Sequence, residues 1–208
     1  MTIGIVDYGV GNRRSVEKAF EKVGASVALT SDAEVLASCA GLVVPGVGAF
    51  PEAVRRLRAS GLDALVVERA AAGTPVIGLC LGMQLLFESS SEHEGATGLG
   101  ILPGRIVKLE TGGLNLPHIG WNTITWTRSS PLVDGLPDGA AFYHVHSYAP
   151  EPADPDIALG LGDYGGSFVS FVERGNVFGA QCHPEKSSTH GLRLLANFVS
   201  LCSQVPVQ

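Results

Sequence analysis

Four short strand-like runs in the first 80 residues constrain the fold of this chain more than any other feature of its sequence. The runs cover residues 3–6, 26–29, 41–44 and 75–79. Segments with helical periodicity separate or follow them, at residues 15–23, 33–37, 51–58 and 62–72. Apolar runs without polar alternation are typical of strands buried on both faces, as in a parallel sheet covered by helices. We therefore predict an α/β fold with a mostly parallel central sheet flanked by helices.

After about residue 100 the pattern changes to strands separated by turn residues. The predicted strands cover residues 101–109, 121–127, 141–148, 157–161, 168–173 and 177–181. A last helix is predicted over residues 189–201, where apolar side chains recur at helical spacing. A chain of 208 residues is long enough for one sizeable core, and we see no repeat or linker. We therefore predict a single domain, residues 1–208, with an antiparallel strand extension in its second half.

Composition excludes several classes of function. A net charge of −6 argues against a nucleic-acid-binding protein, because no basic stripe offsets phosphate repulsion. No apolar run reaches the roughly 18 residues needed to span a bilayer, and the N-terminus has no signal-peptide pattern. The four cysteines show no CxxC spacing, which favours reduced thiols. We therefore predict a cytoplasmic protein that binds neither nucleic acid nor membrane.

One cysteine stands at the end of a predicted strand, between two glycines. The segment 78–82 reads GLCLG, with Cys80 at its centre, and a helix is predicted from Gly82 to residue 89. This is the form of a nucleophile elbow, in which the residues two before and two after the nucleophile must be small. The N-terminus of the helix would favour a thiolate, and the N–H of Leu81 could stabilise an oxyanion. The pattern predicts a nucleophilic thiol, although a lone cysteine is more often a buried structural residue.

A base for that thiol stands near the C-terminus. His183 and Glu185 lie two residues apart at the end of a predicted strand, so their side chains are expected on the same side. Pro184 fixes φ between them and limits their relative motion. A carboxylate beside an imidazole holds the tautomer that can exchange a proton with sulfur. We therefore predict Cys80, His183 and Glu185 as catalytic residues.

Together these residues resemble the class I, or triad, glutamine amidotransferases. The segment GLCLGMQ carries that family's nucleophile motif, and HPE carries its His–Glu pair. Within the family, further segments resemble the glutaminase subunits of imidazole glycerol phosphate synthases. These are DYGVGN at 7–12, PGVGAF at 45–50, PHIGWN at 117–122, YHVHSY at 143–148 and HPEKS at 183–187. The resemblance implies the flavodoxin-like fold of the family and hydrolysis of L-glutamine to glutamate and ammonia through a Cys80 thioester.

The resemblance also implies roles for further residues. Backbone N–H groups of Leu81, Val47 and Gly48 would form the oxyanion hole. L-Glutamine would be bound by four residues: Gln84, Glu92, Ser147 and Tyr148. A carboxylate such as Glu92 suits the α-ammonium group, yet with Glu88 and Glu94 it could equally belong to a solvated acidic patch. No metal and no cofactor is implied.

A single domain of this size leaves no room for an ammonia-accepting synthase. The resemblance implies a heterodimer with a (β/α)₈-barrel cyclase that makes imidazole glycerol phosphate and aminoimidazole-carboxamide ribonucleotide in histidine biosynthesis. Exposed Trp121, Tyr143 and Tyr148 would suit that interface, although core packing is the more common fate of an aromatic residue. The chain departs from the family pattern at Arg13, Asn115 and Cys182. The first two put interface details in doubt, and Cys182 is expected to pack away from His183.

Other functions remain open from the sequence. The nearest alternative is a glutaminase subunit of another synthase, for anthranilate, aminodeoxychorismate, guanylate or pyridoxal phosphate synthesis. A thiol hydrolase or peptidase without a partner would use the same elbow. A metal-binding protein could use His144 and His146 with His118 or His183, but no further ligand stands at a recognisable spacing. A non-enzymatic binding module would have no use for a complete Cys-His-Glu set.

Overall fold

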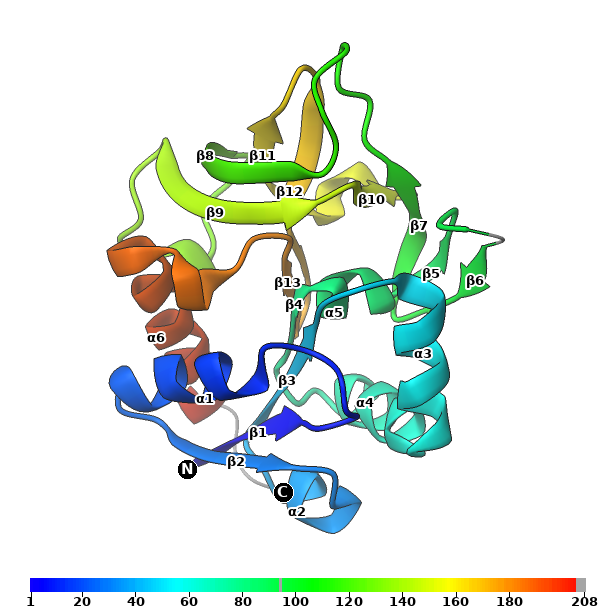
Figure 1. Ribbon diagram of the computed structural model, residues 1–208. Coiled ribbons are helices and arrows are strands. Elements are labelled where there is room, and N and C mark those ends of the chain that lie inside the picture. Colours follow the sequence, from blue (N-terminus) through cyan, green and yellow to red (C-terminus); the bar gives the residue numbers. More distant parts are fainter. Residues whose placement is uncertain (94, 205–208) are drawn as a thin grey trace.

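The computed structural model of the chain describes residues 1–93 and 95–204. Its main feature is a long mixed sheet (Figure 1). Parallel strands form one half, in the spatial order β2 (Ser26–Thr30), β1 (Thr2–Val6), β3 (Gly41–Gly46), β4 (Val76–Cys80) and β13 (Val177–Ala180). Antiparallel strands extend it, in the order β12 (Ser167–Arg174), β11 (Ala158–Asp163), β8 (His118–Trp126) and β9 (Ala140–His146). The predicted α/β fold is therefore confirmed.

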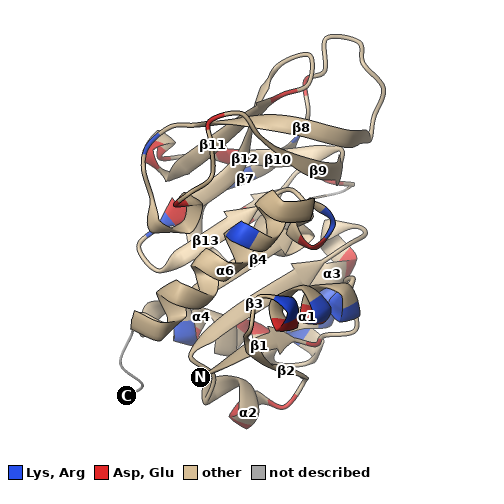
Figure 2. Ribbon diagram, turned by 90° about the vertical axis from the view of Figure 1, so that its left-hand side faces the viewer, with Lys and Arg blue, Asp and Glu red and all other residues tan. Residues whose placement is uncertain are grey.

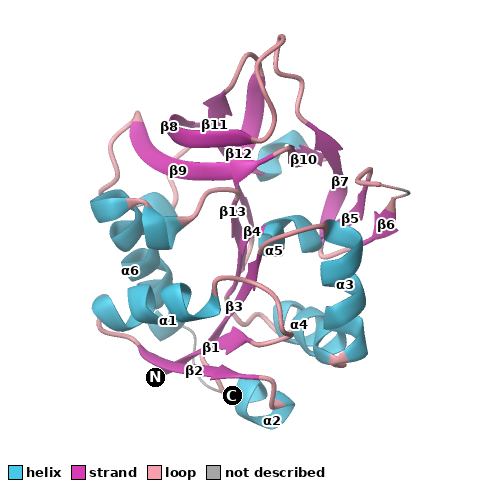
Figure 3. Cartoon of the chain, viewed as in Figure 1, coloured by secondary structure: helices cyan, strands magenta, loops and turns pink. Residues whose placement is uncertain are grey.

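Helices cover both faces of the parallel half (Figure 3). On one face lie α1 (Arg13–Lys22) and α6 (Ser188–Gln204). On the other lie α3 (Phe50–Ala59), α4 (Leu62–Ala71) and the short α5 (Leu81–Leu85), while α2 (Ala33–Ala37) lies at the β2 end of the sheet. Along β3, Leu42 and Val44 pack into the cluster that includes α3 and α4, and Val43 packs into the one that includes α1 and α6. This two-sided burial explains why β3 has no polar alternation.

A smaller second sheet corrects two predictions. It contains β10 (Tyr148–Pro152), β7 (Leu102–Lys108), β5 (Phe87–Ser90) and β6 (Ala96–Thr97). The helix predicted over 82–89 ends at Leu85, because the carbonyls of Leu85 and Leu86 accept hydrogen bonds from residues 99–102 and β5 pairs with β7. The strand predicted over 141–148 is broken at Ser147, because β9 pairs with β8 and β10 pairs with β7 in the other sheet. The end of the helix at Leu85 and the strand break at Ser147 both place loop residues near the end of β4.

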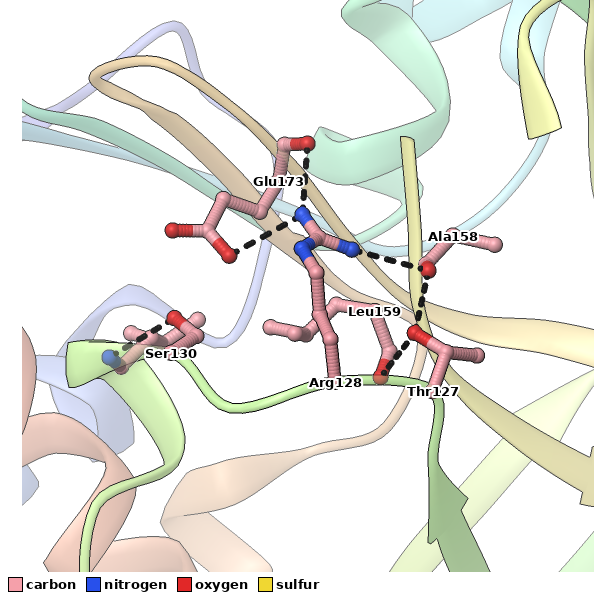
Figure 4. Close-up of polar contacts among 7 residues, drawn as sticks. Thr127, Arg128, Ser130, Ala158, Leu159 and Glu173 are labelled. Atoms are coloured by element: carbon pink, nitrogen blue, oxygen red, sulfur yellow. Dashed lines mark hydrogen bonds and ion pairs between the residues drawn. The ribbon is translucent and has the colours of Figure 1, made fainter. Parts of the chain in front are cut away.

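The loop after β8 is tied to the neighbouring strands by polar contacts (Figure 4). Thr127 Oγ1 donates to Ala158 O at 2.7 Å, and Arg128 Nη1 donates to the same oxygen at 3.1 Å. Arg128 Nη2 also contacts Glu173 Oε2 at 3.1 Å, so one guanidinium joins β11 to β12. These contacts join three strands of the antiparallel extension to one another. The 3₁₀ turn η1 (Pro131–Val133) follows Arg128 in the chain, and η2 (Pro155–Ile157) ends directly before Ala158.

Charged side chains on α1 are paired along the helix. Arg14 contacts Glu17 at 2.8 Å and Lys18 contacts Glu21 at 2.8 Å, so basic and acidic positions alternate there in Figure 2. Pairs of this kind at i,i+3 spacing on an exposed face add little stability. No helix in the described part of the chain is long and apolar enough to cross a membrane.

Candidate active site

Cys80 is the last residue of β4 and has the strained backbone of a nucleophile elbow. Its φ is 53° and its ψ is −115°, in a region that residues with a side chain rarely adopt. The flanking glycines are required by close approach of the backbone. A Cβ on Gly82 would lie 1.8 Å from Val44 O, and a Cβ on Gly78 would lie 2.5 Å from Met83 Cα. The predicted elbow is therefore present, although α5 behind it is only one short turn of helix.

A cavity of about 330 Å³ opens at this elbow, and His183 lines its other side. The predicted oxyanion and glutamine-binding residues all line it as well: Val47, Gly48, Leu81, Gln84, Glu92, Ser147 and Tyr148. They come from the ends of β3 and β4, from the segment after β5, and from the break between β9 and β10. Residues far apart in the sequence thus meet where the parallel strands end, the usual position of a site in an open α/β sheet.

His183 and Glu185 face each other across a tight turn. His183 Nδ1 lies 2.9 Å from Glu185 Oε1, and Asn12 Nδ2 lies 3.5 Å from the same oxygen. The pair is held by the 3₁₀ turn η3 (Pro184–Lys186), with Pro184 at its first position, and not by strand alternation as predicted. The prediction of a contact was right and its local geometry was wrong. The turn is anchored by His183 N donating to Tyr143 O at 2.8 Å and Ser187 Oγ donating to His183 O at 2.7 Å.

The surroundings of His183 favour its protonated form. Burial lowers the pKa of His183, but its interactions with Cys80 and Glu185 outweigh burial and raise the pKa to about 10. Glu185 Oε2 is buried, and none of the residues that the structure describes donates to it. The imidazole contacts the other oxygen of this carboxylate, Oε1. A thiol can pass its proton to an imidazole on the same cavity, which leaves a thiolate and an imidazolium, the pair that nucleophilic acyl transfer needs.

The loop after β3 forms the wall next to the elbow. Tyr8 Oη donates to Pro45 O at 2.6 Å, which fixes the start of this loop against the segment after β1. Gly48 has φ of 95°, a backbone that glycine adopts without strain. Val47 is 42% exposed, so this part of the loop faces open space beside the cavity. Val47, Gly48 and Leu81 therefore line the part of the cavity next to the thiol.

Comparison with known proteins identifies the family. The model of the family "Glutamine amidotransferase class-I" matches residues 4–202, nearly the whole chain. The chain belongs to the class I glutamine amidotransferases. Curated relatives cover the same span and are named imidazole glycerol phosphate synthase subunit HisH. The protein of Bacillus cereus (strain G9842) is 48% identical, with 94% of this chain and 93% of that one covered. The protein of Moorella thermoacetica is 44% identical, with 96% and 94% covered.

Solved structures of lower identity support the fold of this amidotransferase. A glutamine amidotransferase from Thermotoga maritima superposes with a TM-score of 0.70 at 13% identity, covering 98% of this chain and 98% of that one. PurLQS from the same organism gives a TM-score of 0.75 at 16% identity, covering 96% and 98%. At such identities the likeness concerns the path of the backbone alone.

The amidotransferase has a buried amide beside its thiol that the sequence did not reveal. Gln181 Nε2 donates to Cys80 Sγ at 3.8 Å, and Val145 O lies 4.0 Å from the same sulfur. Gln84 Nε2 donates to Gln181 Oε1 at 3.0 Å and to Tyr148 O at 3.1 Å. The position of Gln181 follows from the register between β13 and β4. Ala180 pairs with Leu79, so the next residue of each strand, Gln181 and Cys80, lie side by side.

Glu92 does more than line the cavity. Its Oε2 accepts a hydrogen bond from Phe50 N at 2.8 Å, so the carboxylate caps the start of α3. Glu88 has a separate partner, Gly104 N at 2.9 Å, and Glu94 lies outside the described residues. Glu88 and Glu92 thus hold different backbone amides. Glu92 is the only carboxylate among the described residues that line the cavity.

His118, His144 and His146 form a cluster next to the cavity, which His146 itself lines, and a metal site was one alternative for these residues. His146 Nδ1 contacts Tyr148 O at 2.9 Å and its Nε2 contacts His118 Nδ1 at 3.2 Å. His144 contacts Ser170 Oγ at 2.8 Å through Nε2. Burial is the main cause that lowers the pKa of all three histidines, that of His146 to about 4. Over residues 1–93 and 95–204, no His, Cys, Asp or Glu group of three or more is arranged to hold a metal ion.

Two of the three departures from the family pattern, Arg13 and Cys182, have structural explanations, whereas nothing in the structure explains the side chain of Asn115. Arg13 forms an ion pair with Asp7, so it is held within its own loop. The backbone oxygen of Asn115 accepts a hydrogen bond from Tyr164 Oη at 2.8 Å. Cys182 is fully buried in the core, as expected, and burial raises its pKa.

The predicted exposure of three aromatics is only partly right. Trp121 is 56% exposed, whereas Tyr143 and Tyr148 are half-buried. Tyr143 is partly covered because it packs edge-on against Trp121 and its backbone anchors the η3 turn. Tyr148 is partly covered because β10 pairs with β7.

Proposed function

We propose that this chain is the glutaminase subunit of an imidazole glycerol phosphate synthase. It hydrolyses L-glutamine to glutamate and ammonia and acts in histidine biosynthesis. The main support for glutaminase activity is that Cys80, at the elbow, and His183 line the same cavity. The choice of synthase is supported by relatives of that name, 44% to 48% identical over nearly their whole length.

In the proposed mechanism Cys80 attacks the side-chain amide carbonyl of glutamine. The oxyanion of the tetrahedral intermediate is stabilised by N–H groups of Leu81 and of the Val47–Gly48 segment. His183 gives its proton to the leaving nitrogen, ammonia departs and a thioester remains. Water then attacks the thioester, with His183 taking its proton, and glutamate is released. Glu185 orients His183 and stabilises its charge throughout.

The α-amino and α-carboxylate groups of glutamine would bind at the far end of the cavity. Glu92 supplies the negative charge for the ammonium group, while it still accepts from Phe50 N. Gln84, Ser147 and Tyr148 line the intervening wall. Of these, Gln84 already donates both to Tyr148 O and to Gln181, so its contribution to glutamine is made mainly through the wall that it holds.

The ammonia is proposed to pass directly to a cyclase partner. In water at neutral pH most ammonia becomes ammonium and loses its nucleophilicity, so release into solvent would waste it. We propose a heterodimer with a (β/α)₈-barrel cyclase that uses the ammonia to form imidazole glycerol phosphate and aminoimidazole-carboxamide ribonucleotide. Exposed Ile119 and Trp121 on β8 supply apolar surface for that contact.

Residues 1–208 are proposed to act as one unit in the cytoplasm. The four cysteines are free thiols, which fits a reducing compartment. The parallel and antiparallel strands share one continuous sheet across the site. Both observations suit an enzyme subunit that meets its partner inside the cell.

The proposal is tested by reconstitution with candidate synthases. Glutamate release is measured with this chain alone, with the cyclase, and with the cyclase and its ribonucleotide ligand. We expect the fastest turnover, and imidazole glycerol phosphate as product, only in the last mixture. Ammonia transfer to an anthranilate, aminodeoxychorismate, guanylate or pyridoxal phosphate synthase, with none to the cyclase, would assign the chain to that other enzyme. Turnover of peptide esters without turnover of glutamine would make it a thiol hydrolase.

A further inference from the structure

Gln181 lies beside the thiol of Cys80 but has no role in the proposed mechanism. Its side chain is fully buried, one residue after β13 and two before His183. The amide lies between the sulfur of Cys80 and the side chain of Gln84, with its Nε2 at 3.8 Å from Sγ and its Oε1 at 3.0 Å from Gln84 Nε2. An N–H···S contact of this length is a hydrogen bond, since sulfur is larger than oxygen. Both the oxygen and the nitrogen of the amide therefore have hydrogen-bond partners inside the protein.

The hydrogen-bond network determines which end of the Gln181 amide faces the sulfur. Tyr148 O is a backbone carbonyl and can only accept, so the Gln84 atom beside it must be the amide nitrogen. That nitrogen donates a second hydrogen bond, which requires an acceptor, and Gln181 must present its oxygen. The Gln181 nitrogen is thereby left to face Cys80 Sγ. Tyr148 O, Gln84 and Gln181 thus form a directed chain that ends on the sulfur.

The acceptor at the start of this chain is itself held in place. Tyr148 O also lies 2.9 Å from His146 Nδ1, so a second donor fixes the same carbonyl. Because the pKa of His146 is lowered to about 4 by burial, its ring is neutral at physiological pH and brings no positive charge to the cavity. Neutral groups alone therefore orient the Gln181 amide, and their arrangement does not change with pH near neutrality.

We propose that Gln181 is a further residue of the thiol site, whose N–H group holds the sulfur in place and favours its ionised form. The inference rests on the proposed function only in taking Cys80 as the nucleophile. A hydrogen bond to an anion stabilises the anion, and more strongly inside a protein than in water. It also keeps the sulfur directed toward the cavity before glutamine arrives. In this arrangement Gln84 is a positioning residue for Gln181, in addition to lining the cavity.

The chain offers a matched control for loss of a buried amide. Asn197 is nearly fully buried in α6, where its Nδ2 donates to Leu132 O at 2.9 Å and to Asp134 O at 2.8 Å. It packs near η1 and does not line the cavity around Cys80. Asn197→Leu therefore removes a buried amide with comparable hydrogen bonding and leaves the sulfur untouched.

The test measures the alkylation of Cys80 by iodoacetamide, a small neutral reagent that does not need the glutamine site. Rates are followed from pH 5 to pH 9 by peptide mass, with far-UV circular dichroism as a check on folding. Gln181→Met removes the N–H group at similar size, and we expect alkylation at pH 7 to slow about tenfold, with the pH profile displaced to higher pH. Gln181→Glu replaces the donor with a negative charge, so a larger decrease is expected. Asn197→Leu should alkylate at the wild-type rate.

A second variant tests the direction of the chain without changing Gln181. Gln84→Glu places an acceptor where Gln84 now donates, so the Gln181 amide should invert and turn its oxygen toward the sulfur. We expect alkylation to slow at least as much as in Gln181→Met, whereas Gln84→Met, which imposes no direction, should have the smaller effect. Alkylation within twofold of wild type in Gln181→Met and Gln84→Glu would overturn the proposal. Glutamine hydrolysis by the wild-type heterodimer is assayed in parallel, and its absence would reject the proposed function instead.

Discussion

The two walls of the cavity are built by different means. The elbow wall, residues 44–48 and 78–84, is held by close backbone approach: a Cβ on Gly46 would lie 2.7 Å from Gly82 N, and one on Gly82 would lie 1.8 Å from Val44 O. The turn wall, residues 143–148 and 181–187, is held by side-chain hydrogen bonds, such as His183 to Glu185 and Ser187 to the backbone of His183. One wall depends on the absence of side chains and the other on their presence.

Because of this difference, substitutions in one wall should mainly affect the stability of the fold, and substitutions in the other should mainly affect reactivity. Adding an atom to the elbow wall forces backbone apart and should damage the fold. Removing an atom from the turn wall breaks a hydrogen bond while the backbone keeps its other contacts, so it should change reactivity first. Substitutions in each wall test that division, and a substitution of an elbow glycine with purely chemical effects would break it.

The largest effect is expected for Gly82→Ala. Its Cβ would overlap Val44 O, and backbone cannot move aside as a flexible side chain can. We expect a loss of more than about 4 kcal/mol in the free energy of unfolding, enough to leave little folded protein. Gly24→Ala is the control, because Gly24 has positive φ but has no atom within 4 Å of the added Cβ. It should lose about 1 kcal/mol. Equal losses in urea denaturation would contradict the prediction.

His183→Gln should remove activity from a folded protein. Without the imidazole no group exchanges protons with the sulfur and the leaving nitrogen, so kcat of the heterodimer should fall about 10⁴-fold. His190→Gln is the matched control, since His190 contacts the backbone of Ala141 and does not line the cavity. Glutamate release by His190→Gln at the wild-type rate is expected, and glutamine turnover by His183→Gln would contradict the assignment of the base.

Glu185→Gln should reduce kcat about 10²-fold, because a neutral amide can still orient the imidazole but cannot stabilise its charge. The same variant tests the electrostatics of the turn wall. The contacts with Cys80 and with Glu185 raise the pKa of His183 against the effect of burial, so removal of the carboxylate should lower this pKa from about 10. NMR titration of the His183 ring measures this directly. An unchanged titration midpoint would show that the carboxylate does not act on His183.

The raised pKa of His183 also predicts a pH dependence of stability. Since the folded pKa of about 10 exceeds the ordinary value of 6.5, protonated His183 stabilises the folded state. That contribution is fully present below pH 6.5 and is lost as pH rises through about 10. The wild-type free energy of unfolding should thus fall by up to about 5 kcal/mol relative to His183→Gln over this window. A difference that grows with pH in urea denaturation would have the wrong sign.

The smallest effect is expected at Glu92, where charge and capping can be separated. Glu92→Gln keeps an oxygen for Phe50 N but removes the charge, so KM for glutamine should rise with little change in stability. Glu92→Ala should raise KM similarly and also lose about 1 kcal/mol through the lost cap. Kinetics and thermal unfolding of both variants separate the two roles. An unchanged KM in both would leave Glu92 as a cap for α3 alone.

Much of this molecule could be predicted from its sequence, because local patterns and global fold agree there. The unbroken apolar runs indicate the parallel strands, and GLCLG indicates the elbow at Cys80. The helix predicted over 82–89 failed because its apolar pattern also suits β5, and only pairing with β7, distant in sequence, decides between them. Gln181 was missed for the same reason. Its role depends on the register between β13 and β4, which no local pattern encodes.

The most direct test of the central claim is covalent labelling with a γ-diazoketone analogue of glutamine, followed by mass mapping of the modified residue. If the thiol at the elbow attacks glutamine with His183 as its proton partner, the heterodimer should carry a single adduct on Cys80. Labelling should be blocked by excess glutamine and slowed strongly in His183→Gln. An adduct on any other residue, or glutamine hydrolysis that survives Cys80→Ala, would contradict the account.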